Sequence, residues 1–88
     1  MIPKKYYQQN LDKDGNLVRY NSQKGPVEIS EMSDSHLENS IHYFQKKSLT
    51  NYDTYYKILI QSLEKEREKR KVLNNNIIVD SVNDIIIL

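Results

Sequence analysis

The 88-residue chain contains no cysteine and no tryptophan, and only two glycines and two prolines. Without cysteine, neither a disulfide nor a thiolate metal site can stabilise the fold. Two glycines cannot build a glycine-rich phosphate loop, and there is no G-x-S-x-G nucleophile elbow. The only histidines, His36 and His42, fall roughly 120° apart on a predicted helix and cannot share a metal ion. We therefore expect no enzyme, no catalytic residue, no metal and no cofactor.

The chain also lacks a strong charge of either sign and a long hydrophobic run. Thirteen basic and twelve acidic residues leave a net charge of +1. This balance argues against a general nucleic-acid binder, since neutralising phosphates requires a basic excess. No run approaches the roughly 20 apolar residues of a membrane span, and the N-terminus does not resemble a signal peptide. We expect a cytoplasmic protein without membrane contact.

What is present is enough chain for one small domain with a thin core. Only 38% of residues are hydrophobic, and 28% are charged. We predict a single α+β domain over residues 1–88. A small β-hairpin region lies at 1–30, an antiparallel two-helix hairpin at 33–73, and an apolar tail with a short strand at 74–88. Because so small a core gives little stability, we also expect a partner or a homo-oligomer.

Turn residues divide the N-terminal region. The Asp-Gly pair ending at Gly15 favours a tight hairpin, with strands at 5–11 and 16–21. A second turn at 24–26 then precedes a brief strand over 27–30. A small sheet of this kind needs a helix to pack against.

A first helix is predicted at 34–47. Ser33 has the position of the N-cap, and Met32 and Leu37 have the spacing of a hydrophobic staple around it. Residues Leu37, Ile41 and Phe44 form one apolar stripe.

A second helix is predicted from 52 to about 73, capped by Thr50 or Asn51. Its apolar face consists of Tyr52, Tyr56, Leu59, Ile60 and Leu63. No apolar residue follows over 64–71, where pairs such as Glu66–Arg70 support the helix locally. This charged part overhangs the shorter helix, so it is either solvated or covered by another molecule.

The tail contains β-branched clusters at 77–79 and 85–88. Exposed apolar segments without charge or proline are prone to aggregate. We expect a strand that is covered by the N-terminal hairpin or by another protomer.

Seven tyrosines against one phenylalanine are unusual for a core, since a buried hydroxyl needs a partner. Tyr6 and Tyr7 follow Lys4 and Lys5, a combination suited to stacking bases beside a phosphate. Packing inside the protein explains this pair of tyrosines equally well, and packing between the helices is the simpler explanation for the tyrosines of the second helix.

Residues 24–70 resemble a family of small uncharacterised bacteriophage proteins, in which a glycine turn and a short strand lead to a Met-x-x-Ser-His-Leu-x-Asn helix start and a tyrosine-led second helix. The chain departs from that pattern in lacking an upstream tryptophan, in its shorter glycine turn, and after Val72. The matching positions are Gly25, Ile29, Glu31, Met32, His36, Leu37, Asn39, Ile41, Tyr56, Leu59, Glu64 and Arg67. The resemblance implies a phage accessory protein acting in an infected bacterium and no defined activity.

Three functions follow as hypotheses. The leading one is a phage interaction protein that blocks a host defence or host machinery protein by stoichiometric binding. The alternative is an oligomeric sponge for a nucleotide or cyclic oligonucleotide, and a nucleic-acid-binding factor comes third. Candidate contacts for a host protein are Tyr43, Lys46, Lys47, Arg67 and Arg70; those for a nucleotide are Lys4, Lys5, Tyr6, Tyr7 and Arg19.

Overall fold

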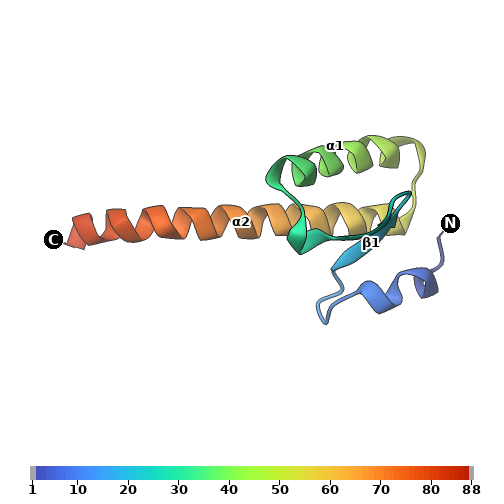
Figure 1. Cartoon of the computed structure of the whole chain (residues 1–88), viewed down its shortest axis with the longest axis horizontal. Coiled ribbons are helices and arrows are strands. Elements are labelled where there is room, and N and C mark those ends of the chain that lie inside the picture. The colour runs from blue at the N-terminus through green and yellow to red at the C-terminus, as the bar shows by residue number, and fades with distance from the viewer. Residues whose placement is uncertain (1, 88) are drawn as a thin grey trace.

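A computed structural model describes the backbone of residues 2–87 and the side chains of residues 2–73. It is an α+β fold with two helices and one two-stranded antiparallel hairpin (Figure 1). The elements in chain order are the 3₁₀ turns η1 (Lys4–Tyr6) and η2 (Gln8–Asn10), the strands β1 (Arg19–Ser22) and β2 (Gly25–Glu28), the 3₁₀ turn η3 (Ile29–Glu31), and the helices α1 (Asp34–Thr50) and α2 (Thr54–Ile87).

The start of α1 is confirmed as predicted. The Ser33 side chain accepts the N–H of His36 at 3.1 Å, which satisfies one of the free donors at the helix start. Met32 and Leu37, on either side of this cap, are both buried, as the staple requires. The helix ends at Thr50 instead of residue 47, because Lys46, Lys47 and the residues after them are all compatible with helix.

The link between the helices is short, and α2 runs back along α1 in the opposite direction (Figure 1). The prediction that Thr50 or Asn51 caps α2 is wrong. Asp53 does so, because its Oδ1 accepts the N–H of Tyr55 at 3.1 Å. Asp53 can serve because α1 extends to Thr50 and moves the start of the second helix along the chain.

Beyond the region beside α1, the backbone of α2 continues as helix to Ile87, so the predicted C-terminal strand is wrong (Figure 1). Each residue added to an existing helix gains a backbone hydrogen bond, and this outweighs the modest β preference of isoleucine and valine. The side chains of 74–88 lie outside those described, so the predicted covering of this apolar tail stays a prediction. The long helix gives the molecule extents of 56 × 26 × 23 Å.

The β-hairpin is displaced from its predicted position. Residues 4–10 form η1 and η2 instead of a strand, and the pair Leu11–Leu17 makes only an isolated bridge. The turn predicted around Gly15 is present, with a φ of 82° and with the Asp12 carboxylate accepting the N–H groups of Asp14 and Asn16. These local bonds close the turn, and beside it Leu17 donates to Ser62 of α2.

The hairpin forms at the second turn. Tyr20 pairs with Val27 and Ser22 with Gly25, so that a two-residue loop joins β1 to β2. Gly25 has a φ of 112°, which a residue with a side chain rarely adopts. The sheet leans on the helices as expected, because Tyr20 of β1 is buried in the core.

One core holds these elements together. Figure 1 shows α1 on one side of the first half of α2 and the N-terminal turns on the other, with the hairpin between them. Ser62 of α2 accepts the N–H of Leu17 at 2.8 Å, so the loop before β1 is bound to the helix. The buried apolar side chains are Tyr7, Leu17, Tyr20, Ile29, Met32, Leu37, Ile41, Leu59 and Leu63. Within the described residues, neither helix has the length and apolar character that crossing a membrane requires.

The core predicts a large difference between two leucine substitutions. Leu59 is fully buried on α2, whereas Leu49 near the end of α1 is 84% exposed. Leu59→Ala should lower the free energy of unfolding by about 2–5 kcal/mol, because it leaves a cavity. Leu49→Ala should change it by about 0.5 kcal/mol or less. Urea unfolding monitored by circular dichroism measures both, and similar losses in the two variants would contradict this core.

Candidate functional site

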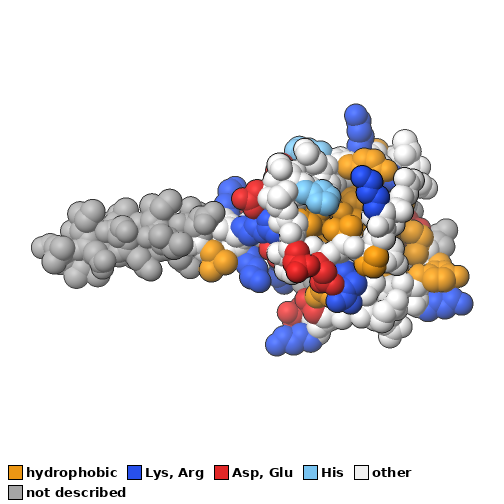
Figure 2. Space-filling view, in the orientation of Figure 1, with side chains coloured by type: hydrophobic (Ala, Val, Ile, Leu, Met, Phe, Trp, Pro, Cys, Tyr) orange, Lys and Arg blue, Asp and Glu red, His pale blue; other side chains and the backbone are white. Residues whose placement is uncertain are grey.

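A groove of about 760 Å³ lies between the N-terminal turns, the β-hairpin and the two helices. We call it the tyrosine groove, because six of the seven tyrosines line it. Figure 2 shows hydrophobic side chains, a class that includes tyrosine, on this face of the molecule, with basic, histidine and acidic side chains around them. The lining residues are Ile2, Tyr6, Tyr7, Asn10, Arg19, Tyr20, Asn21, Ser22, Gln23, Lys24, Val27, His36, Tyr43, Phe44, Lys47, Tyr55 and Tyr56.

Six of the seven aromatic rings that line the groove contact one another in a continuous series. Phe44 of α1 is central, with its ring centroid 5.5 Å from that of Tyr20, 5.0 Å from that of Tyr43 and 6.2 Å from that of Tyr56. Phe44 and Tyr56 are stacked, with planes inclined by 28°. The other four contacts are tilted or edge-to-face, the arrangement that aromatic quadrupoles favour. The rings therefore form a preorganised apolar surface.

Tyr55 of α2 connects this surface to the N-terminal turns. Its ring centroid is 5.1 Å from that of Tyr7 and 5.6 Å from that of Tyr56. Burial, and to a lesser extent the neighbouring tyrosines, raises the pKa of the Tyr55 hydroxyl above its ordinary value. The groove thus holds a neutral phenol at every pH near neutrality.

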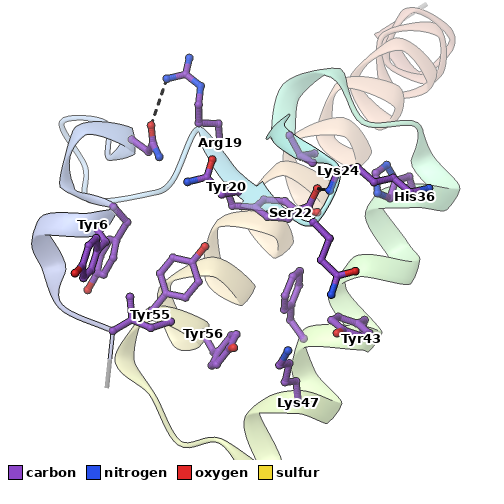
Figure 3. Close-up of a pocket in the computed structure, with 17 residues that line it drawn as sticks. Tyr6, Arg19, Tyr20, Ser22, Lys24, His36, Tyr43, Lys47, Tyr55 and Tyr56 are labelled. Atoms are coloured by element: carbon purple, nitrogen blue, oxygen red, sulfur yellow. Dashed lines mark hydrogen bonds between the residues drawn. The ribbon is translucent and has the colours of Figure 1, made fainter.

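The charged side chains of the groove are all basic. Lys47 of α1 extends over two rings, with its Nζ 5.6 Å from the centroid of Tyr43 and 5.9 Å from that of Tyr56. Arg19 and Lys24 come from the hairpin. In Figure 3 Arg19 points away from the tyrosines, where it donates to Asn10 and pairs with Glu28, whereas Lys47 lies beside the rings. No Asp or Glu lines the groove, whose residues are all among those described.

Five of the residues selected from the sequence thus lie in one place. Tyr6, Tyr7, Arg19, Tyr43 and Lys47 all line the groove, although they come from three separate segments. Tyr7 is buried and Tyr6 is exposed, so the two neighbours have different roles: Tyr7 packs in the core and Tyr6 remains accessible.

The three other lysines selected from the sequence lie outside the groove lining. Lys4, Lys5 and Lys46 are all exposed. Lys5 extends over the ring of Tyr6 at 5.6 Å, so it neighbours the groove without lining it.

Arg67 and Arg70 lie elsewhere, in ion pairs between α2 and the start of α1. Arg67 pairs with Glu38 at 2.8 Å, and Arg70 pairs with both Asp34 at 2.8 Å and Glu66 at 2.9 Å. Hydrogen bonds to Glu66 and Asp34 raise the pKa of Arg70. The first turns of the charged overhang are therefore covered by this protein's own α1.

The sequence reasoning missed several groove residues. Tyr20, Lys24 and His36 approach the groove only through tertiary packing, which no local pattern indicates. The sequence predicts Phe44 and Tyr56 only for the helix interface; Phe44 does pack against the core, and both residues also line the groove. Tyr52 was assigned to the buried face of α2, but it precedes the helix and is 94% exposed.

A second hollow, of about 770 Å³, lies at the end of the helical hairpin, where α1 passes into α2. We call it the hairpin tip. It contains acidic and basic side chains together with exposed Leu49 and Tyr52. Among the described residues no group of three His, Cys, Asp or Glu side chains could hold a metal ion.

Comparisons with protein-family models, with curated proteins and with solved structures find no match to this chain. The resemblance to bacteriophage proteins therefore stays a prediction.

The ion pairs of Arg70 predict a measurable contribution to stability. Arg70 is 22% exposed and its partner Glu66 14% exposed, so Arg70→Met leaves a largely buried carboxylate without its guanidinium. The free energy of unfolding should fall by about 1–3 kcal/mol in urea unfolding. Lys71→Met, at the next and exposed position, is the control and should lie within about 0.5 kcal/mol of the unsubstituted protein. Equal effects of the two substitutions would show that Arg70 is solvated like Lys71.

Proposed function

We propose that the protein acts without catalysis, by stoichiometrically binding a small anionic ligand with flat rings in the tyrosine groove. A nucleotide or a cyclic oligonucleotide has this chemistry. In the setting that the phage resemblance implies, the ligand is a nucleotide signal of the infected bacterium, and the protein removes it from solution.

The charge of the groove is the observation that carries this proposal. The whole chain has a net charge of only +1, yet the groove lining contains Lys24 and Lys47 and no carboxylate. The third cation of the lining, Arg19, is paired with Glu28 and points away from the tyrosines (Figure 3). A phosphate beside Lys24 and Lys47 would meet positive potential.

The rings and the size of the groove favour the same ligand class. Exposed Tyr6 and Tyr43 offer π-faces, and stacking a base on such a ring contributes about 1–3 kcal/mol. A volume of about 760 Å³ lies within the usual range for sites of small organic ligands. The hairpin tip is of similar size but contains Asp53, Lys57 and Glu64 together, which gives no preference for an anion.

Calorimetry with ATP, GTP, cyclic AMP and the cyclic dinucleotides of adenine and guanine tests this proposal. At least one nucleotide should bind the unsubstituted protein, and Lys47→Ala should weaken it by about tenfold or more, through loss of a charge-assisted contact. Lys46→Ala is the matched control, because this neighbouring lysine is exposed and lies outside the groove. The affinity of this variant for the nucleotide should be unchanged. Absence of heat with every nucleotide would refute the proposed function.

A second candidate is the binding of a host protein, the leading hypothesis from the sequence. The observation that favours it is the hairpin tip, where Leu49 and Tyr52 are 84% and 94% exposed. Exposed aromatic and apolar side chains of this kind are frequent anchors in protein interfaces. Its other candidate contacts on α1 are Tyr43 and Lys46, which are exposed, and Lys47, which lies over the rings of the groove.

Passing a bacterial lysate over the tagged protein tests this second candidate. One host protein should be retained in stoichiometric amount, and Tyr52→Ser should release it because the interface loses its aromatic anchor. Glu68→Ser, an exposed change further along α2, should retain the same protein. Finding no bound protein, or equal retention by both variants, would count against the tip as a binding surface.

A further inference from the structure

Asp53 bonds to two segments that are far apart in the sequence. Its Oδ1 accepts the N–H of Tyr55 and caps α2, while its Oδ2 accepts the N–H of Ile2, 51 residues away, at 2.7 Å. Hydrogen bonds from Tyr55 and Ile2 hold the pKa of this carboxyl below its ordinary value. The carboxylate is therefore ionised at neutral pH and accepts both bonds at once.

The segment held by Asp53, residues 2–10, forms one wall of the tyrosine groove, and we call it the N-terminal wall. Its far end is fixed to the loop before β1, because Val18 donates to the carbonyl of Asn10 at 2.8 Å and Leu11 pairs with Leu17. Between these ends the chain makes the tight turns of η1 and η2. The wall residues that line the groove are Ile2, Tyr6, Tyr7 and Asn10.

The opposite wall belongs to the helices and includes Tyr55, two residues after Asp53. The contact between Tyr7 and Tyr55, with ring centroids 5.1 Å apart, lies where the two walls meet. The start of the N-terminal wall is held by the bond to Asp53 and by the packing of partly buried Ile2 against the core, whereas Lys4, Lys5 and Tyr6 are all exposed. The bond from Ile2 to a fixed helix cap therefore helps to set where this wall begins.

We infer that Asp53 is a positioning residue, which sets the N-terminal wall of the groove against α2 through its bond to Ile2. Its effect on ligand affinity rests on the proposed function, whereas its effect on the wall does not. An Asp53 variant that keeps the cap but loses the bond should widen the groove without unfolding the helices.

Asp53→Asn separates the two bonds. Asparagine is as good an N-cap as aspartate, since its side-chain oxygen still accepts from Tyr55. The side-chain NH₂ of asparagine then faces the backbone N–H of Ile2. Because both groups are donors, the bond to Ile2 is lost. Asp14→Asn is the control, because it removes the same charge from an exposed turn and leaves an Asn-Gly pair that suits the turn equally well.

Amide hydrogen exchange followed by NMR measures directly how firmly the N-terminal wall is held. In Asp53→Asn the N–H groups of Ile2, Tyr6 and Tyr7 should exchange about tenfold faster or more, and those of α2 should keep their protection. The pKa of Tyr55 should fall toward its ordinary value as Tyr7 moves away. Asp14→Asn should change neither. Unchanged exchange at these three residues, or equal loss of protection throughout α2, would overturn the inference.

The ligand measurement separates this inference from the proposed function. With cyclic di-AMP as the probe, Asp53→Asn should bind about three- to tenfold more weakly than Asp14→Asn, as expected for a site that has lost part of its preorganisation. Faster exchange with unchanged affinity would overturn the positioning role while leaving the groove as the binding site. No binding to any variant would count against the proposed function, and the exchange rates would still decide the role of Asp53 in the wall.

Discussion

The packing of α1 on α2 is the interaction on which the rest of the structure depends. Leu37 and Ile41 of α1 and Leu59 and Leu63 of α2 are each no more than 2% exposed, and they are the most completely buried large side chains described. The other segments are attached to this pair of helices one by one: β1 through Tyr20 and Phe44, the loop before it through Ser62, and the N-terminal wall through Asp53. A core this small supplies only one such centre. The groove therefore exists because the two helices hold its walls in place.

The parts of the fold that the sequence predicts well are those determined locally. Ser33, Met32 and Leu37 specify the start of α1 within six residues, and the structure confirms them. The parts that it predicts poorly depend on competition between distant segments. The loop around Gly15 favours a turn both in the predicted hairpin of 5–11 with 16–21 and in the observed structure. Only packing against α2 decides that the hairpin forms between β1 and β2 instead. The continuation of α2 follows from the cooperativity of helices, which single-residue preferences do not describe.

The candidate site shows the same division. Residue type alone selected Tyr6 as a candidate contact for a nucleotide, because tyrosine beside lysine suits an anionic ring system. The hypothesis of a host-protein partner selected Tyr43 and Lys47, which line the groove, and also Arg67 and Arg70, which the fold uses to bind α2 to α1. A list of basic residues cannot distinguish these two uses, since the difference lies in which carboxylates are nearby. The groove becomes distinctive only once Asp34, Glu38 and Glu66 are seen to lie elsewhere.

The central claim is that the tyrosine groove, and not another surface, receives the ligand. The most direct measurement is to titrate isotope-labelled protein with a cyclic dinucleotide and map the NMR shift changes onto the structure. Our account predicts that the largest changes fall on Tyr43, Lys47 and Tyr56, with Leu49 and Tyr52 unaffected. Changes confined to the hairpin tip, or none at saturating nucleotide, would contradict it.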